Sequence, residues 1–581
     1  MKSLCVLVIV LALGSNPSGQ ELELDRNWKL KAGDDNGWSA PELDEADWRA
    51  VKIAQPWEVV LGEAYDGYGW YRNTFRVPRE LQRLSDTGFV LELGQIDDVD
   101  EVWFNGTKIG STGQFPPAYE TAWTAERRYF VPLELLTGRA EHVIAVRVFD
   151  GMGGGGLYRG TPRLVPAEAG DQVQVGFVGA FAQPRVLERG DAHRPKVLLR
   201  NRSKKSLTFF LSWKLETDAG EHVSEGSEPV ALAPGETLGR SLPIEFAEPG
   251  FYELAAFGEF GERSQTEPAS TRIGFATDEI SSPLTRPDDF DEFWSSTLAE
   301  LASVEPDFQV VAHPDRDIAT HHTFEVTMRS LDQVRVKGWI QVPKDKRDAP
   351  FPAVLIVPGY TQSMEPLPEI TGNSILFCFN IRGHGRSTDD VKFGRADFWL
   401  RGLEDPDGYF YQGAYSDCVR AVDYLVSRED VDESRLAVTG ASQGGGLSLA
   451  TAALDPRIDL CAPDIPWLCS WERYFATAVD ANEIDAWVQR RSTERSQERV
   501  MHVLSYFDNL NLVERIRCPV LVGMGLADDI CPPATIYATY NRIQSEKGLV
   551  AYPQAAHWVP FEHYGKKFGW FVMKFGEISR R

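Results

Sequence analysis

The chain has 581 residues, of which 43% are hydrophobic and 25% are charged. This composition is typical of globular proteins, and the length predicts about three or four domains. The net charge of −25 would repel phosphate backbones and anionic lipid, so neither nucleic acid nor a membrane is expected as a partner.

The first 20 residues differ from the rest of the chain. Lys2 is followed by the apolar run LCVLVIVLAL and then by small residues, with Ala12 and Gly14 placed for cleavage. The run is shorter than the roughly 20 apolar residues that a membrane span needs, and it lacks the polar face of an ordinary surface helix. Residues 1–20 are therefore predicted to be a cleavable signal peptide, which implies a secreted or periplasmic protein.

Two series of strand patterns follow the signal peptide. Residues 21–167 contain short alternating runs such as WYRNTFRVP and HVIAVRVFD, which predict a β-sandwich. Within them VWFNGTKIG predicts a hairpin, with Asn105 and Gly106 supplying the positive backbone angles of its turn. A second series, including KVLLRN and YELAAFGEF, predicts a smaller immunoglobulin-like sandwich over residues 168–278.

The pattern changes after residue 280. RPDDFDEFWSSTLAELAS has apolar residues at helical spacing, and Asp289 and Glu292 are placed as a capping pair. Apolar runs such as PAVLIV, RLAVTG and PVLVGMG then alternate with helical runs such as YSDCVRAVDYLVSR. This alternation predicts a mostly parallel sheet covered by helices over residues 279–581. The predicted fold is therefore multidomain, with two β-sandwiches followed by an α/β domain.

The cysteines do not indicate a metal centre. Cys5 lies in the predicted signal peptide, and the other cysteines all follow residue 377, within apolar runs such as ILFCFN. Such positions favour buried thiols over disulfides, although export would permit disulfides. Neither a CxxC pair nor a cysteine and histidine cluster at zinc spacing occurs, so no metal is predicted.

The stretch GASQGGG, residues 440–446, lies between a predicted strand and a predicted helix. It matches G-x-S-x-G, the nucleophile elbow, in which glycines at positions 440 and 444 would let the turn close and expose the hydroxyl of Ser442. Taken alone, a glycine-rich turn with a solvated serine fits the same letters equally well.

A nucleophilic serine needs a base to take its proton and an acid to orient that base. In this arrangement the acid and then the histidine follow later strands. The run PVLVGMG is followed by Asp528 and Asp529, and the run GLVAYP is followed by His557. His563 lies inside the predicted C-terminal helix, so His557 is favoured as the base. Spacing alone does not separate the two aspartates.

Two backbone N–H groups are needed to stabilise the oxyanion of the reaction. The residue after the nucleophile, Gln443, supplies one candidate. The turn at residues 358–361, directly after the strand VLIV, supplies the other.

These motifs resemble the acetyl xylan esterase and cephalosporin C deacetylase family of carbohydrate esterases, which have the α/β-hydrolase fold. The resemblance spans about residues 283–576 and is carried by DDFDEFWSSTLAEL, GLEDPDGYFYQGAYSDCVRAVDYL, VTGASQGGGLSLATAALDPRI, DIPWLC and GLADDICPPATIYATYNRI. It implies Ser442 as nucleophile, Asp528 rather than Asp529 as acid, and His557 as base. It also implies Tyr360 and Gln443 as the oxyanion donors.

The chain departs from the family pattern at two points. Members typically carry Arg-Gly-Gln where this chain has Arg382-Gly383-His384, and His-Glu where it has His557-Trp558. The first departure puts the bracing of the elbow in question, and the second the packing of the histidine loop. His384 could be a second base, but a structural or hydrogen-bonding histidine is favoured because RGHG-type turns are widespread in this fold.

The first sandwich is similar to the galactose-binding-like domain of β-galactosidase-type glycoside hydrolases and sialate O-acetylesterases. WYRNTFRVP, IDDVDEVWFNG and VIAVRVFD carry this likeness. It implies carbohydrate binding through exposed aromatic residues such as Trp123 and Tyr158. A spacer, or a wall beside the catalytic mouth, is favoured instead because this fold serves many roles.

Together these features predict a secreted serine esterase that removes O-acetyl groups from an acetylated oligo- or polysaccharide through an acetyl-enzyme, without a cofactor. The alternatives are another acyl hydrolase or peptidase of the same fold, and a carbohydrate-binding protein with an inert hydrolase domain. Relatives often form rings of subunits, which implies a homo-oligomer, but the two added N-terminal domains could obstruct that contact.

Overall fold

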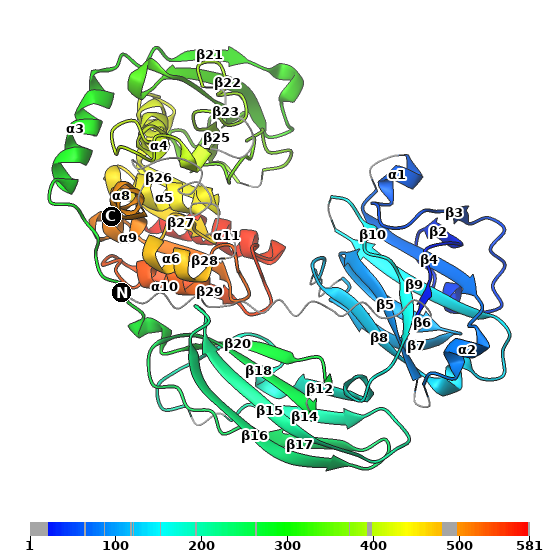
Figure 1. The fold of residues 1–581 in the computed structure, drawn as a ribbon. Helices are drawn as coiled ribbons and strands as arrows, with labels where there is room; N and C mark the ends of the chain where they lie inside the picture. Colours follow the sequence, from blue (N-terminus) through cyan, green and yellow to red (C-terminus); the bar gives the residue numbers. More distant parts are fainter. Residues whose placement is uncertain are drawn as a thin grey trace.

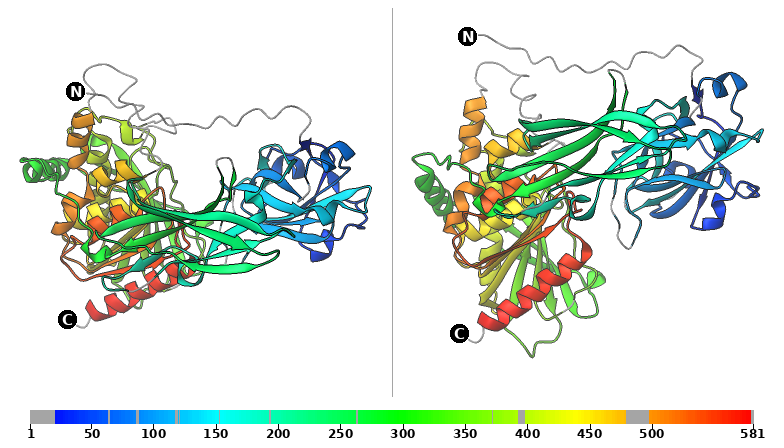
Figure 2. Two further views of the ribbon diagram at one scale, coloured as in Figure 1. Left: turned by 60° about the horizontal axis from the view of Figure 1, so that its bottom comes forward. Right: turned by 90° about the horizontal axis from the view of Figure 1, so that it is seen from below.

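The computed structural model describes residues 21–578 except 63–64, 86–87, 117–118, 120, 152, 192–193, 262–263, 371, 392–397 and 479–496. The predicted signal peptide lies outside these residues. Two β-sandwiches, antiparallel except for the pair β13 and β20, precede a domain with a mostly parallel sheet and helices, as predicted (Figure 1). The second sandwich lies between the first sandwich and the helix-containing domain (Figure 2).

The first sandwich consists of two sheets. One sheet has the order β1-β11-β5-β10 with β8 also on β5, and the other has the order β3-β2-β4-β9-β6-β7. The elements are β1 (Leu22–Glu23), β2 (Trp28–Ala32), β3 (Arg49–Ala50), α1 (Glu58–Leu61), β4 (Gly67–Phe75), α2 (Arg79–Gln82), β5 (Gly88–Asp97), β6 (Val99–Phe104), β7 (Thr107–Thr112), β8 (Glu126–Pro132), β9 (His142–Asp150), β10 (Gly156–Arg159) and β11 (Arg163–Pro166).

The hairpin predicted in this sandwich is confirmed. β6 and β7 pair antiparallel, and their turn is made by Asn105 (φ 49°) and Gly106 (φ 78°). Both residues lie in the left-handed region, which matches the right-handed twist of the strands they join. Large aromatic side chains, including Trp28, Trp57 and Tyr71, fill the core between the two sheets.

The second sandwich packs a three-stranded sheet, β12-β14-β17, against a sheet with the order β13-β20-β18-β15-β16 and β19 on β18. Its strands are β12 (Val173–Phe177), β13 (Arg185–Leu187), β14 (Lys196–Asn201), β15 (Leu207–Thr217), β16 (His222–Leu232), β17 (Thr237–Ser241), β18 (Gly250–Phe260), β19 (Ser264–Gln265) and β20 (Ala269–Phe275).

The third domain is built on one nine-stranded sheet with the order β21-β22-β23-β25-β24-β26-β27-β28-β29. The strands β24 to β29 run parallel to one another, and β21, β22 and β23 form an antiparallel edge in which β23 pairs antiparallel with β25. The strands are β21 (Gln309–Ala312), β22 (His321–Arg329), β23 (Arg335–Pro343), β24 (Phe351–Ile356), β25 (Ile375–Asn380), β26 (Val431–Ala441), β27 (Leu460–Asp464), β28 (Val520–Gly525) and β29 (Lys547–Tyr552).

Helices cover both faces of this sheet. On one face α11 buries Phe571 and Phe575 against strand residues such as Val354 and Ala437. On the other face the largest core of the protein joins the sheet to the remaining helices. The helices are α3 (Phe290–Ser303), α4 (Phe410–Val426), α5 (Gln443–Leu454), α6 (Trp471–Thr477), α8 (Gln497–Ser505), α9 (Asn509–Leu512), α10 (Pro533–Tyr540) and α11 (Phe561–Ile578). Within the described part of the chain, no helix combines the length and apolar character that a membrane crossing requires.

The capping pair predicted at the start of α3 is wrong. Asp289 does occupy the N-cap position, but its side chain makes no capping hydrogen bond. Its carboxylate instead accepts a hydrogen bond from the Tyr506 hydroxyl at 2.5 Å. A tertiary partner far along the chain has replaced the local one that the sequence pattern indicated.

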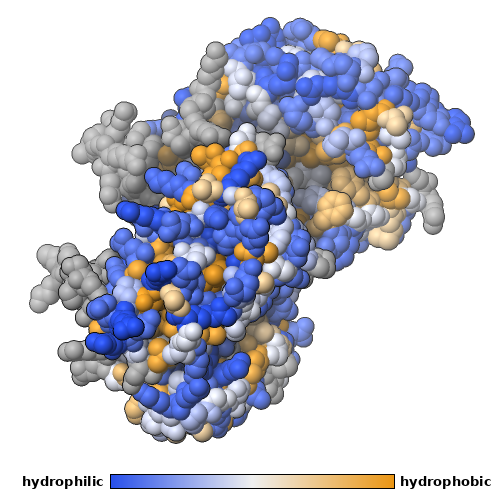
Figure 3. All heavy atoms as spheres, turned by 90° about the vertical axis from the view of Figure 1, so that its right-hand side faces the viewer, coloured by the Kyte–Doolittle hydropathy of each residue, from blue (hydrophilic) through white to orange (hydrophobic). Residues whose placement is uncertain are grey.

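The six described cysteines are buried thiols, as predicted. Burial raises the pKa of the Cys378 thiol to about 12. The surface has the opposite character: the face drawn in Figure 3 is mostly hydrophilic, with smaller apolar groups among the charged residues.

Candidate active site

The predicted nucleophile elbow has the geometry that G-x-S-x-G implies. β26 ends at Ala441, α5 begins at Gln443, and Ser442 between them has φ 58° and ψ −119°. A Cβ on residue 440 would lie 2.6 Å from the Val357 carbonyl oxygen, and one on residue 444 would lie 2.5 Å from the same atom. Both glycines are therefore required for the close approach of the elbow to the end of β24.

The structure brings Ser442, His557 and Asp528 together. Their loops follow β26, β29 and β28, and the carboxyl ends of these parallel strands lie at the same edge of the sheet. Ser442 Oγ lies 3.0 Å from His557 Nε2, and His557 Nδ1 lies 2.9 Å from Asp528 Oδ2. These distances form a continuous hydrogen-bonded path from the hydroxyl to the carboxylate.

The structure distinguishes the two neighbouring aspartates. The Asp528 side chain is fully buried and also accepts the backbone N–H groups of Ile530 and Cys531 at 2.9 and 2.8 Å. The Asp529 side chain is 55% exposed and pairs with Arg272. Only Asp528 is in position to orient His557, which is the arrangement that the family resemblance implies.

The two residues predicted as oxyanion donors flank the elbow. Gln443 is the first residue of α5, so its backbone N–H has no acceptor within the helix. Tyr360 lies in the turn after β24, which is the strand beside β26. Its ring packs edge-on against Trp467 and Phe398, with centroids 5.7 and 5.6 Å apart. The catalytic role of both N–H groups remains a prediction.

Aromatic residues form a wall beside Ser442. The backbone N–H of Trp467 donates to the Ser442 carbonyl at 3.0 Å, which ties this wall to the elbow. The Trp467 ring in turn packs against Trp399 and Trp471, each with a centroid separation of 5.7 Å. Trp467 thus joins a cluster of aromatic rings to the backbone of the elbow.

His384 braces the elbow and lies outside the predicted triad. Its Nε2 lies 3.1 Å from the Gln443 amide nitrogen, and the amide oxygen of Gln443 accepts the Tyr411 hydroxyl at 2.8 Å. The same amide nitrogen is 3.3 Å from the Pro358 carbonyl and 3.4 Å from the Gly359 carbonyl. The Gln443 side chain thus joins the elbow to the oxyanion turn, and an unprotonated His384 Nε2 is its acceptor.

Burial gives His384 a distinct electrostatic state. It is 1% exposed, and its ring packs 4.5 Å from that of Phe398. Desolvation lowers the pKa of His384 to about 4. This neutral, buried imidazole fits the hydrogen-bonding reading of the Arg-Gly-His departure.

His563 also lies outside the predicted triad. It is on α11, as predicted, where its Nε2 lies 2.8 Å from Asp464 Oδ1 and its Nδ1 lies 3.0 Å from the Tyr552 hydroxyl. Lys567 donates to the other oxygen of Asp464 at 2.5 Å. The backbone carbonyl of Asp464 accepts a hydrogen bond from the Ser442 N–H at 3.0 Å. The buried ionic cluster is therefore connected to the elbow through the backbone of Asp464.

The loop that carries His557, residues 553–560, is bonded to the loop that carries Asp528, residues 526–532. These segments are the histidine loop and the acid loop. The backbone N–H of Ala527 donates to the Ala555 carbonyl at 3.0 Å, two residues before His557. Trp558, which stands where the family typically has glutamate, is half-buried, and its backbone N–H donates to the Ala556 carbonyl. The second departure from the family pattern therefore leaves the histidine in contact with its acid.

The described residues contain two groups of potential metal ligands, and within each group the ligand atoms lie within 4.8 Å of one another. One comprises Asp528, Cys531 and His557, and two of these already bond to each other. The other comprises Asp97, Asp98 and Asp150 in the first sandwich. Burial and the neighbouring Asp98 raise the pKa of Asp97. Neither group has a feature beyond its ligand types that indicates a metal.

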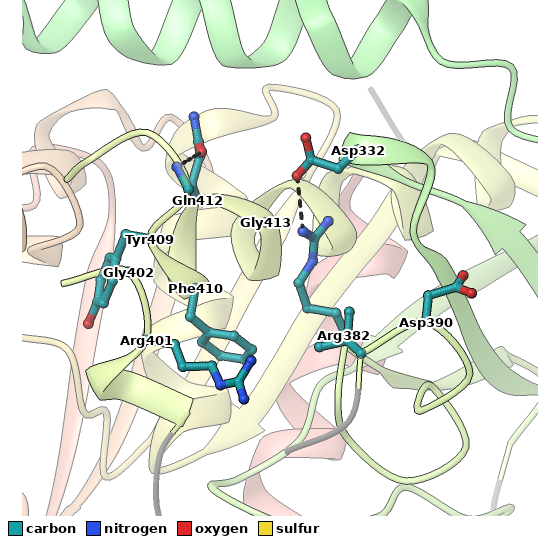
Figure 4. A pocket seen from close by; sticks show the side chains of 11 residues that line it. Asp332, Arg382, Asp390, Arg401, Gly402, Tyr409, Phe410, Gln412 and Gly413 are labelled. Carbon is teal, nitrogen blue, oxygen red and sulfur yellow. Dashed lines mark hydrogen bonds and ion pairs between the residues drawn. The ribbon is translucent and has the colours of Figure 1, made fainter. Parts of the chain in front are cut away.

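A cavity of about 510 Å³ lies beside Arg382 (Figure 4). Arg382 reaches Asp332 at 3.6 Å across this cavity and also pairs with the buried Asp417 at 2.9 Å. The described lining residues include none of the predicted triad. One of them, Phe410, packs against Phe398, which packs against Tyr360. The cavity is thus separated from the oxyanion turn by a layer of rings.

The aromatic residues predicted as sugar contacts in the first sandwich differ in their surroundings. Trp123 is 50% exposed. The Tyr158 hydroxyl donates to the Gln95 side chain at 3.0 Å and to the Trp123 carbonyl at 3.1 Å. Tyr158 therefore has a structural partner, and Trp123 is the residue of the pair that is available to a ligand.

Comparison with known proteins identifies the family. Residues 278–574, about half of the chain, match the acetyl xylan esterase family (AXE1). The chain belongs to this family. As a member of the acetyl xylan esterase family, it is a carboxylic ester hydrolase of the carbohydrate esterase type.

Proteins named as acetyl esterases or acetyl xylan esterases are similar to this chain. It is 30% identical to the acetyl esterase Axe7A of Xylanibacter ruminicola over 50% of this chain and 68% of that protein. Among solved structures, it is 31% identical to an acetyl xylan esterase from Paenibacillus sp. R4, with 51% and 98% of the two chains covered and a TM-score of 0.48. Acetyl xylan esterase 1 from Thermoanaerobacterium sp. JW/SL YS485 is 26% identical, with 52% and 98% covered and a TM-score of 0.48.

Proposed function

We propose that this family member is a secreted serine esterase that removes O-acetyl groups from carbohydrates through an acetyl-enzyme. The observation that carries the proposal is the 3.0 Å separation of Ser442 Oγ from His557 Nε2, with Asp528 behind the histidine. Ser442 is the nucleophile, His557 the general base and Asp528 the residue that orients the imidazole.

The reaction proceeds in two halves. In the first, His557 Nε2 takes the Ser442 proton as Oγ bonds to the acetyl carbon, and the same proton then passes to the departing sugar hydroxyl oxygen. In the second, His557 takes a proton from water as the water oxygen bonds to the acetyl carbon, and the same proton then passes to Ser442 Oγ as its bond to the acetyl group breaks and acetic acid leaves. The N–H groups of Tyr360 and Gln443 stabilise the oxyanion in both halves. No cofactor enters the scheme.

The substrate class is proposed from the family and from the surroundings of Ser442. The named relatives are acetyl esterases or acetyl xylan esterases. The rings of Tyr360 and Trp467 beside the elbow support a narrow acyl site that suits an acetyl group. An acetylated oligo- or polysaccharide is therefore the proposed partner.

Aryl esters of increasing acyl length test this proposal. We expect the highest kcat/KM for the acetate ester, a lower value for butyrate and the lowest for octanoate, because longer chains meet the aromatic wall. Equal or greater kcat/KM for octanoate would contradict the acetylesterase assignment. Cleavage of a peptide amide in preference to an aryl acetate would favour a peptidase of the same fold.

Substitution of the nucleophile tests the chemistry separately. Ser442→Ala should abolish labelling by a fluorophosphonate probe and lower turnover by several orders of magnitude. Labelling or turnover equal to the parent would contradict the role of Ser442. Acetate release from a panel of acetylated glycans then identifies the sugar.

Secretion is proposed from residues 1–20 alone. If they are a signal peptide, expression with the full leader in a bacterial host should deliver a mature protein to the periplasm or medium, with its new N-terminus near residue 20. Mass spectrometry of the purified protein measures this terminus. Full-length protein retained in the cytoplasm would contradict the proposal.

A further inference from the structure

An arginine of the second sandwich contacts the loop that carries Asp528. Arg272, on β20, donates from Nη1 to the Asp528 carbonyl at 3.2 Å and to the Leu526 carbonyl at 3.4 Å. Its Nη2 donates to Asp529 Oδ1 at 2.5 Å, and its Nε donates to Glu253 Oε1 at 2.5 Å. The guanidinium thus binds three groups of the loop that carries Asp528, and it also binds one carboxylate on its own sheet.

The contact belongs to a packed interface between the two domains. Phe251 of β18 is 1% exposed, lies in the core of the esterase domain, and packs against Tyr537 of α10 with centroids 5.8 Å apart. The side-chain amide of Asn541, just after α10, donates to the carbonyls of Thr277 and Ile280 at 2.9 Å. α10 begins directly after the acid loop, so the second sandwich and the linker that follows it contact this segment at both ends.

The position of Asp528 depends on the backbone that Arg272 holds. The Asp528 side chain faces His557, and its carbonyl on the other side faces Arg272. A planar guanidinium can bond a carbonyl and a carboxylate at once, whereas an ammonium acts as a single point charge. The positive charge is balanced by Glu253 and Asp529, so the arginine can hold the loop without placing an uncompensated charge behind the acid.

We propose that Arg272 is a positioning residue for the esterase reaction, and that the second sandwich is in this way part of the active-site architecture. The inference rests on the proposed role of Asp528. Arg272 lies outside residues 278–574, the part of the chain that matches the family. A domain beyond the family core therefore supports the catalytic acid in this chain.

The test uses the full chain and compares Arg272→Ala and Arg272→Lys with the control Arg240→Ala. Arg240 lies in the same sandwich, on β17, and pairs there with Glu228. We expect Arg272→Ala to lower kcat for an aryl acetate roughly tenfold with KM almost unchanged, because a small displacement of a catalytic group costs rate more than binding. Arg272→Lys should recover part of this loss, and Arg240→Ala should match the parent.

A proton resonance reports the acid position directly. The His557 Nδ1–H bonded to Asp528 should give a far-downfield signal in the parent and in Arg240→Ala, and this signal should shift or broaden in Arg272→Ala. A parental kcat together with an unchanged signal in Arg272→Ala would overturn the inference, as would a kcat loss in which the signal stays unchanged. If Arg272→Ala does not fold, Arg272→Lys carries the same comparison, with a smaller loss expected and the same two results against the inference.

The activity of two other variants tests the proposed function independently of Arg272. Ser442→Ala and Asp528→Asn decide whether the triad performs the reaction, and neither substitution changes a group that Arg272 binds, because Arg272 binds the backbone carbonyl of Asp528 and not its side chain. If both stay active, the proposed function fails. If both are inactive while Arg272→Ala has parental kinetics and the parental signal, only the positioning role fails.

Discussion

His384→Gln is expected to make the esterase domain less sensitive to acid without removing its activity. The His384 imidazole is 1% exposed and accepts a hydrogen bond from the Gln443 amide. Glutamine, which the family typically carries at this position, can accept the same hydrogen bond through its carbonyl oxygen but does not titrate. The substitution therefore separates the hydrogen bond from the titration.

The magnitude follows from the low pKa of the buried imidazole. Burial lowers the pKa of His384 from 6.5 to about 4. Between pH 6.5 and pH 4, His384 is protonated in the unfolded chain but stays neutral in the folded protein. The contribution of the neutral imidazole to the free energy of unfolding is therefore fully present above pH 6.5 and is lost as the pH falls toward 4. At pH 5, about 1.5 pH units below 6.5 at about 1.36 kcal/mol each, His384 should cost the folded state about 2 kcal/mol.

Urea titrations at pH 7 and pH 5 measure this difference. The unfolding transition to follow is that of the esterase domain, which is identified at pH 7 by the loss of aryl acetate turnover. Between the two pH values the free energy of unfolding of the parent should fall by about 2 kcal/mol more than that of His384→Gln. The control is His222→Gln, which removes an exposed histidine from the second sandwich and should behave like the parent.

Two results would refute this reasoning. Equal pH dependence in the parent and in His384→Gln would mean that the imidazole is not kept neutral by burial. A fall in kcat of several orders of magnitude in His384→Gln at pH 7 would instead indicate that His384 takes part in proton transfer. Turnover close to the parental rate is the expected result.

Three further predictions concern the triad and its support. Ser442→Ala and His557→Ala should each lower kcat by several orders of magnitude, and the double variant should be little worse, because a triad acts as a unit; additive losses would argue against it. Asp528→Asn should be severe, since it disturbs the tautomer and charge of the histidine pair, whereas Asp529→Asn should be mild because Asp529 faces Arg272 and solvent; the reverse order in kcat would mean that the acid is misassigned. Lys567→Met should lower the free energy of unfolding by about 3 kcal/mol by leaving Asp464 short of a buried partner, and a melting temperature equal to that of the parent would contradict this.

Much of the architecture could be predicted because it depends on local patterns. Alternating runs separated by turns predicted the antiparallel sandwiches, and Asn105-Gly106 predicted the hairpin between β6 and β7. Strand-to-helix alternation predicted the mostly parallel sheet. The nucleophile-elbow motif, together with the position of His557 after a later strand, also predicted that Ser442 and His557 would meet, and the shared edge of the parallel strands is the physical reason.

Features that depend on distant partners could be decided only by the tertiary structure. Asp528 and Asp529 have the same local pattern, but Asp528 faces the histidine loop while Asp529 faces Arg272. Asp289 fits a local capping pattern, yet its carboxylate accepts a hydrogen bond from the hydroxyl of Tyr506, which lies on a distant segment.

The same limit applies to the two residues that support the elbow and the acid. His384 and Gln443 are 59 positions apart, and Arg272 is 256 positions before the carbonyl that it binds. The identity of a residue and the local sequence around it specify the chemistry of its side chain and the element on which it lies. Its hydrogen-bond partner and its pKa depend on which other segments the fold packs against it, since burial and neighbouring charge arise only when those segments come together.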